Sequence, residues 1–194
     1  MKLLNELLML SESKEKNLIG IEIGHNHEFV DGENMYEWHD EFFCNEMDLT
    51  SLKGCPSIIH GMFNCEDNEL TSLKYGPKII DDLFNCAGNK LTSLEHCPKE
   101  VGCDFVCSSN NITSLKDIHK QLHKMKGVFD ANDNPITSHV LGVLLIEGCR
   151  RIEIDNKEVE AIINSYLPNK EGRKGLMKCK AELVDAGYEA FAQI

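Results

Sequence analysis

The chain has 194 residues, with 20 Lys and Arg against 32 Asp and Glu, and its formal net charge is −12 at pH 7. This length supports one domain with a sizeable core, and the 42% apolar content is too high for a disordered acidic tail. A surface that neutralises nucleic-acid phosphates needs clustered Lys and Arg. The charge therefore argues against direct nucleic-acid binding and favours a basic protein partner.

Residues 1–16 form the first predicted unit, an N-terminal helix or leader. An amphipathic helix is expected from Met1 to Glu12, and it ends in Leu10-Ser11-Glu12. This end resembles the short capsid-targeting leaders of internal head proteins of large tailed phages, which are cut after the Glu of a Leu/Ile-x-Glu triplet. The resemblance implies cleavage after Glu12, and a plain capping helix is the alternative. No stretch reaches the ~18 apolar residues of a membrane span, so no membrane association is expected.

A repeat of 21 residues occupies the middle of the chain. Three blocks follow one another without a gap, and a fourth block carries three extra residues: Leu49 to Glu69, Leu70 to Lys90, Leu91 to Asn111 and Ile112 to Pro135. The first three blocks keep a fixed frame, in the first block Leu49, Leu52, Pro56, Ile59, Phe63, Cys65 and Asn68, and the fourth block keeps its ends. One block is therefore one coil of a solenoid, and the fixed Asn (68, 89, 110, 134) predicts a buried amide ladder.

The frame resembles the short bacterial and phage type of leucine-rich repeat, with Phe63, Cys65, Asn68, Leu70 and Leu73 at its pattern positions. The resemblance implies an α/β repeat fold in which each coil contributes one short parallel strand. Weaker copies extend the register in both directions and predict a solenoid over residues 17–156. Seven strands are expected, at about 21–23, 42–44, 63–65, 84–86, 105–107, 129–131 and 152–154.

Residues 157–194 are predicted to form a C-terminal helical cap over the last coil. Val159, Ile162, Ile163 and Tyr166 lie on one helical stripe, and the segment from Leu176 to Tyr188 suits a second and a third helix. A docking helix for a partner is the alternative interpretation of this segment. Its six basic and six acidic residues cancel, so the whole net charge lies in residues 1–156.

Cysteine and histidine patterns give no catalytic or cofactor site. Cys44, Cys65, Cys86 and Cys107 recur once per coil and, without a CxxC pair, are expected to be small buried apolar residues. Cys55, Cys97 and Cys103 fall in turns and are expected to be more exposed, whereas Cys179 belongs to an apolar helical stripe.

His119 and His123 are four residues apart in the insertion of the fourth block, which is expected to be helical. They have no evident third ligand, and whether they bind a metal stays open; surface histidines are the preferred interpretation. His25 and His27 flank Asn26 and are not expected to converge on one centre without further ligands. No catalytic residue, metal site or cofactor is therefore expected.

Strand residues that point away from the core are expected to line the concave face of the solenoid, and many of them are acidic. This face is the predicted site for a protein partner, through Glu22, Glu41, Phe43, Glu46, Met62, Asn64, Glu66, Asp67, Asn85, Asp104, Asp130, Asn132, Asp133, Arg151, Glu153 and Asp155. The alternative is that a thin solenoid simply needs polar residues on both of its faces.

The preferred hypothesis is a non-enzymatic, phage-encoded binding protein that engages, and can inhibit, a basic host or viral protein. It would act in the host cytoplasm, in one version after packaging in the phage head. A structural or assembly component of the virion is the alternative function. The sequence leaves the partner and the oligomeric state open.

Overall fold

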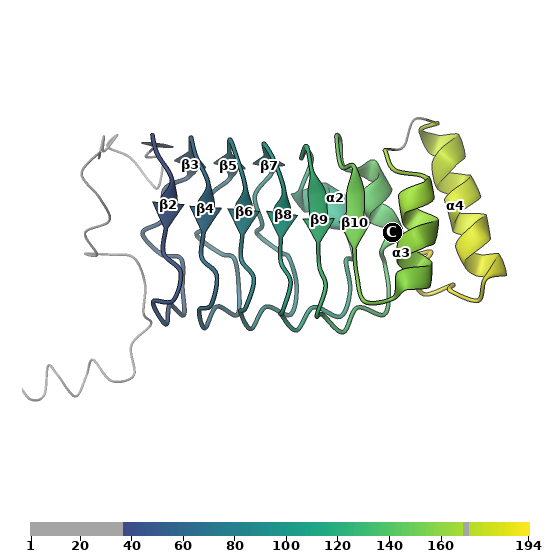
Figure 1. Ribbon diagram of the computed structural model, residues 1–194, viewed down its shortest axis with the longest axis horizontal. Helices are drawn as coiled ribbons and strands as arrows, with labels where there is room; N and C mark the ends of the chain where they lie inside the picture. Colours follow the sequence, from purple (N-terminus) through teal and green to yellow (C-terminus); the bar gives the residue numbers. More distant parts are fainter. Residues whose placement is uncertain (1–36, 169–170) are drawn as a thin grey trace, which may run out of the picture.

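The computed structural model describes residues 37–168 and 171–194, and it shows a stack of parallel coils with helices at the C-terminal end (Figure 1). The protein is thus a parallel β-solenoid, in agreement with the repeat. Among the described residues, no helix is long and apolar enough to cross a bilayer.

A six-stranded parallel sheet runs along the stack. Its strands, in chain order, are β2 (Phe42–Phe43), β4 (Phe63–Asn64), β6 (Phe84–Asn85), β8 (Phe105–Val106), β9 (Val128–Asp130) and β10 (Arg151–Glu153). These lie within one or two residues of the positions predicted from residue 42 onward. The predicted strand at 21–23, like the leader and His25 and His27, lies outside the described residues.

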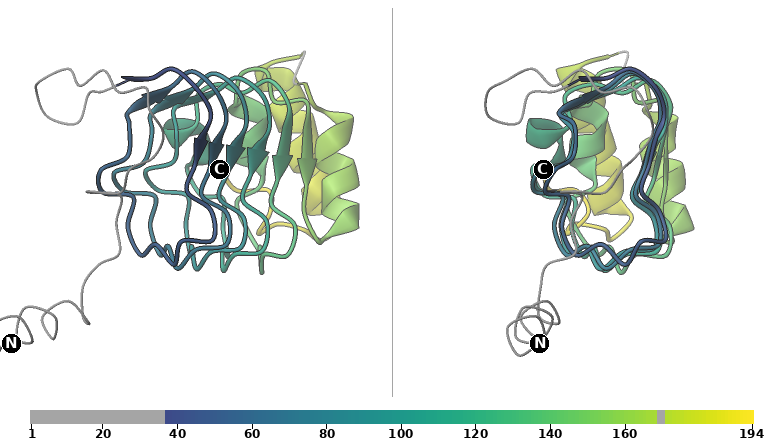
Figure 2. Two further views of the ribbon diagram at one scale, coloured as in Figure 1. Left: turned by 60° about the vertical axis from the view of Figure 1, so that its left-hand side comes forward. Right: turned by 90° about the vertical axis from the view of Figure 1, so that its left-hand side faces the viewer.

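A second parallel sheet forms another wall of the solenoid, and the repeat analysis did not predict it. Its strands are β1 (Glu37–Trp38), β3 (Ile58–Ile59), β5 (Ile79–Ile80) and β7 (Glu100–Val101). Viewed along the solenoid axis, successive coils overlay closely (Figure 2, right), so the walls run straight. The face that was expected to be concave is therefore better described as the outer face of the six-stranded sheet.

The core consists of like side chains stacked from coil to coil. Phe63, Phe84 and Phe105 are fully buried, and neighbouring ring centroids in this row lie 5.8 and 4.8 Å apart. The cysteines two residues further on form a parallel buried row, as predicted, until Ala131 replaces them in β9's coil. Each coil thus closes its neighbour's apolar face, which is why a single repeat could not be stable alone.

The predicted asparagine ladder is confirmed, and its hydrogen bonds join adjacent coils. The Nδ2 group of Asn89 donates to the Cys86 carbonyl of its own coil (3.2 Å) and to the Cys65 carbonyl of the preceding coil (3.0 Å). Its Oδ1 accepts from the Leu70 N–H at 3.0 Å. The amide therefore satisfies buried backbone groups at a sharp turn, where Gly88 has a positive φ of 61°.

Helices form where the chain departs from the regular coil. The insertion of the fourth block forms the short helix α2 (Ile118–Gln121), which confirms its predicted helical character. The 3₁₀ helix η1 (Leu141–Leu145) follows in the next coil, and the chain ends in α3 (Lys157–Ser165) and α4 (Arg173–Asp185). The predicted third helix is absent, because the described chain after α4 continues in turns.

Helix α3 seals the edge of the six-stranded sheet. Asn164 accepts from the Ile152 N–H at 2.8 Å and donates to the Ile152 carbonyl at 2.9 Å. Glu160 accepts from the Ile154 N–H at 2.9 Å and from the Lys157 ammonium at 2.8 Å. An open strand edge is a template for unwanted pairing, so these side chains protect the last coil.

Replacement of Asn110 by Ala should destabilise the protein by at least about 3 kcal/mol, because each buried backbone group left unpaired costs about 1–3 kcal/mol. The Asn110 amide binds the Cys86 and Cys107 carbonyls and the Leu91 N–H. The exposed neighbour Asn111 is the matched control, and Asn111→Ala should change stability by less than about 0.5 kcal/mol. Chemical unfolding of both variants measures the difference, and equal losses would contradict the ladder's role.

Acid should release the cap from β10. Burial by itself would raise the pKa of Glu160, but hydrogen bonds from Lys157 and the Ile154 N–H, together with the nearby Lys157 and Arg151 charges, lower it below its usual value. A carboxylate with a lowered folded-state pKa contributes stability above its unfolded pKa of about 4.3, and loses it as the pH falls toward the folded value. The protection factor of the Ile154 amide against hydrogen exchange, corrected for the intrinsic rate at each pH, should therefore fall below about pH 4.3.

Glu160→Gln should weaken this protection at neutral pH and flatten its dependence on pH. Glu189→Gln, at an exposed position after α4, is the control and should behave as wild type. Unchanged protection in Glu160→Gln would show that the carboxylate does not hold the edge.

Candidate functional site

Strand register places one outward residue of each coil in a continuous row on the six-stranded sheet. Phe43 lies opposite Asn64, which lies opposite Asn85. The row continues through Val106, Asp130 and Glu153. Among the partner-binding residues expected from the sequence, the register therefore aligns Phe43, Asn64, Asn85, Asp130 and Glu153 in one row, whereas Glu22 lies outside the described residues.

We call this surface the acidic sheet face and define it by the described members of that set. They are Glu41, Phe43, Glu46, Met62, Asn64, Glu66, Asp67, Asn85, Asp104, Asp130, Asn132, Asp133, Arg151, Glu153 and Asp155. Within it, Glu46, Asp67 and Asp133 occupy the same turn position in their coils, with positive φ angles of 54°, 51° and 53°. All three residues are exposed.

The N-terminal part of the acidic sheet face carries carboxylates that form no ion pair within residues 37–168 and 171–194. Among the described residues, no ion pair involves Glu41, Glu46, Glu66 or Asp67. Glu66 accepts a hydrogen bond from the neutral Asn85 amide at 3.0 Å, so its charge is held in place but not neutralised. Phe43 is 44% exposed beside this group. An exposed aromatic ring among unpaired carboxylates is suited to contact with a cationic protein surface.

The C-terminal part differs, because cations and backbone groups already engage its acidic side chains. The Arg151 guanidinium lies 3.4 Å from a Glu153 carboxylate oxygen. Asp130 accepts from the N–H of Asn132 at 3.0 Å, and Asp155 accepts from the N–H of Asp133 at 2.9 Å. Much of the acid at this end therefore has a local structural use.

Asp104 also has a structural role. It accepts from the Val128 N–H at 2.7 Å, and a Cβ atom at Gly127 would stand only 1.9 Å from its Oδ1. Asn85 and Val106 are the neutral members of the central row. Two acidic groups therefore flank a middle in which Asp104 is the one carboxylate of the acidic sheet face. The turn carboxylates Asp67 and Asp133, three coils apart, are separated by roughly 14 Å.

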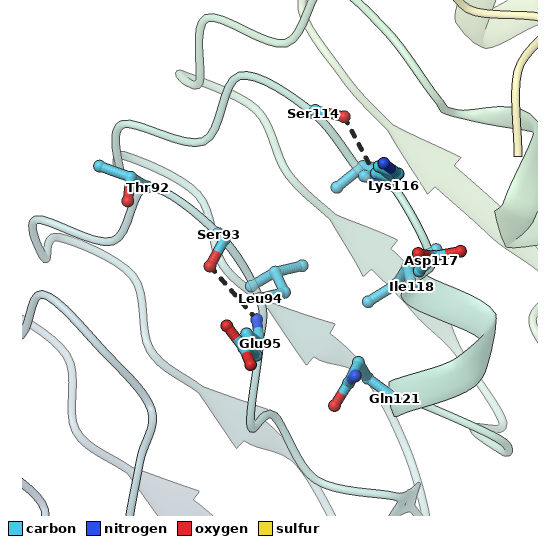
Figure 3. A pocket seen from close by; sticks show the side chains of 10 residues that line it. Thr92, Ser93, Leu94, Glu95, Ser114, Lys116, Asp117, Ile118 and Gln121 are labelled. Atoms are coloured by element: carbon cyan, nitrogen blue, oxygen red, sulfur yellow. Dashed lines mark hydrogen bonds between the residues drawn. The ribbon is translucent and has the colours of Figure 1, made fainter.

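A separate cleft of about 430 Å³ lies beside α2, and the sequence analysis did not identify it (Figure 3). Leu94 and Ile118 contribute apolar surface, and Glu95, Lys116 and Asp117 contribute charges of both signs. The Glu95 and Lys116 N–H groups donate to Ser93 and Ser114 in the coil turns.

Ser114 Oγ lies 3.1 Å from His139 Nδ1, but that nitrogen also lies 2.9 Å from Ser138 Oγ. Ser114 and Ser138 are paired across neighbouring coils. The contacts of His139 with Ser114 and Ser138 therefore link two neighbouring coils, and they do not single out one serine hydroxyl for activation by the histidine.

The cysteines are more deeply buried than the sequence suggested. Cys55 and Cys97 are only 5% and 3% exposed, which corrects their expected exposure, whereas Cys103 is partly exposed. Cys179 is buried in the cap, in line with its apolar stripe. Burial raises the pKa of the Cys44, Cys97, Cys149 and Cys179 thiols to about 12. These groups are therefore neutral and unreactive at neutral pH.

The histidines of the insertion do not form a recognisable metal site. His119 is half-buried, and burial lowers its pKa. His123 is exposed, and its Nε2 lies 3.2 Å from the Lys120 carbonyl. Within the described residues, the group of potential metal ligands that converges lies elsewhere in the fold.

Comparison of the chain with family models, with curated proteins and with solved structures found no match. The class of this protein is described by its own fold and site. It is a parallel β-solenoid with two parallel sheets, a helical C-terminal end and an outer sheet face that carries separate acidic groups.

Thiol labelling should distinguish Cys103 from the other cysteines. We expect iodoacetamide to modify Cys103 in the native protein, and the eight buried thiols only after unfolding, because both access and thiolate formation are suppressed there. Peptide mass spectrometry measures the sites. Rapid native labelling of Cys55 or Cys97 would contradict their burial.

Proposed function

We propose that this protein is a non-enzymatic binding module of the leucine-rich repeat type, phage-encoded, and that its acidic sheet face engages a basic host or viral protein. The observation that carries the proposal is the group of carboxylates with no ion pair in the described part of the chain, on the same parallel sheet as the exposed Phe43. Charges fixed on a rigid scaffold raise the association rate and the selectivity for a partner of opposite charge.

The distribution of charge indicates which residues would form the contact with the partner. Glu41, Glu46, Glu66 and Asp67 would form the main contact, with Phe43 inserted between cationic side chains. The weaker C-terminal group, near Asp133, would receive a second basic segment about 14 Å away. A partner with two basic segments at that spacing fits better than one with a single compact patch.

The proposed setting is the cytoplasm of the infected host. The repeat of the short phage type and the similarity of residues 1–12 to a capsid-targeting leader support this setting. Mass spectrometry of the protein from phage particles tests it, with an N-terminus at Ser13 as the expected result. An intact Met1 in particles would contradict leader cleavage.

Charge reversal on the acidic sheet face should abolish salt-sensitive capture of the partner. In the test variant Glu66, Asp67, Asp130 and Asp133 are all replaced by Lys. Wild-type protein should retain a basic partner at low salt and lose it at high salt, because the contact is largely electrostatic. A zero-length carbodiimide crosslinker should join the partner's lysines to Glu46, Glu66 or Asp67, as identified by mass spectrometry.

The control variant carries the same change in charge away from this face, with Asp82, Glu95, Glu100 and Glu147 replaced by Lys; all four are exposed. Binding should survive in the control if the contact depends on place and not on net charge. Equal loss in both variants, or unchanged binding in the test variant, would overturn the proposal. A virion component would instead crosslink to structural proteins of the particle.

A further inference from the structure

The strongest unassigned cluster of chemically active side chains lies on the other sheet, at the corner that follows β1 and β3. Trp38 is paired with Ile59, so the next residues along the two strands, His39 and His60, face the same corner. The His60 N–H donates to the Trp38 carbonyl at 2.8 Å, which fixes this register. The two imidazole rings stack with their centroids 4.8 Å apart and their planes within 8°.

Glu37, the first residue of β1, completes the group, and His39 directly follows that strand. Residues two apart on a strand point to the same side, so Glu37 and His39 share a face. The Glu37 Oε2 atom lies 3.4 Å from His60 Nε2. One ligand atom from each of Glu37, His39 and His60 lies within 4.8 Å of the others.

Asp81, which belongs to the next coil, orients the imidazole of His60. Its Oδ2 atom lies 2.8 Å from His60 Nδ1, and Ile59 pairs with Ile80, the residue before Asp81. When Nδ1–H donates to this carboxylate, the lone pair of Nε2 is directed toward Glu37. A carboxylate that holds the second nitrogen of a ligating histidine is a regular part of metal sites in proteins.

From this geometry we infer that Glu37, His39 and His60 bind a divalent transition-metal ion, Zn²⁺ in particular, with Asp81 as the positioning residue. Two imidazole nitrogens and one carboxylate oxygen are a donor set that suits Zn²⁺, and water would fill the remaining position. Tetrahedral Zn²⁺ with nitrogen ligands at about 2.0–2.1 Å holds its donors about 3.3 Å apart, close to the separation of Glu37 and His60.

The remaining distances can close by side-chain rotation. The separations of up to 4.8 Å exceed the tetrahedral value by about 1.5 Å. The side chains of His60 and Glu37 are 35% and 48% exposed, so neighbouring core residues do not restrain them. Because the ligands come from two successive coils, a bound ion would clip the first described coil to the second.

Titration of the full, chelator-treated protein with Zn²⁺ tests the site, with isothermal calorimetry as the readout and inductively coupled plasma mass spectrometry as the count of bound metal. Wild-type protein should bind one equivalent and gain thermal stability. His39→Ala, His60→Ala and Glu37→Gln should each lose that equivalent. Asp81→Asn should bind about 10–100-fold more weakly, because it removes only the partner of Nδ1.

His96→Ala and His123→Ala are matched controls at exposed histidines in other parts of the fold and should keep full binding. Far-UV circular dichroism verifies that every variant folds, which is expected because His39 and His60 are exposed. Failure of wild-type protein to bind Zn²⁺ would overturn the inference, as would binding that survives all three ligand substitutions. A thiolate charge-transfer band with Co²⁺ would place the ion on cysteine and would overturn it too.

Discussion

The asparagine that recurs in four successive coils forms the interaction on which the rest of the structure depends. A chain that turns sharply after every short strand brings backbone N–H and carbonyl groups into a region that water does not reach, and each unpaired group would cost about 1–3 kcal/mol. Asn68, Asn89, Asn110 and Asn134 remove that cost, because one amide pairs with groups of its own coil and of the coil before it. The phenylalanine and cysteine rows can then stack without offset, since the ladder holds the register along the axis. Strands of only two or three residues suffice in this fold because the turns, and not the strands, fix the alignment.

The fixed register also determines how charge is presented. Residues at equivalent positions must appear in rows, so a carboxylate in one coil lies directly beside the corresponding side chain of the next. Selection can therefore change the pattern on the outer face one coil at a time without disturbing the core. The acidic groups around Glu66 and around Asp133 differ in this respect: the first has no countercharge among the described residues, whereas the second lies near Arg151 and Lys157. The helical end of the solenoid thus affects both the sheet edge and the local field.

Much of the fold could be predicted from the sequence because the 21-residue period is nearly exact in the middle of the chain. The period located the six-stranded sheet, the Phe63 and Cys65 rows and the asparagine ladder. The second sheet was missed because one of its two strand positions does not repeat in character: Ile79 of one coil pairs with Glu100 of the next. Cys55 was assigned to an exposed turn, but its N–H donates to the Leu52 carbonyl and folds the turn back over the core. His39 and His60 obey the same period, but Glu37 has no counterpart in the repeat frame, so the period alone did not indicate that its carboxylate lies beside them.

The row of buried thiols has a further consequence for the life of the molecule outside a reducing compartment. In the folded protein eight of the nine cysteines are buried and inaccessible to oxidants, so the native state should tolerate air and peroxide well. An unfolded chain would expose all nine at once, at spacings that permit many wrong pairings. Under oxidising conditions unfolding would then be irreversible. The lifetime of the folded protein would be set by the rate of unfolding and not by the equilibrium between folded and unfolded chains.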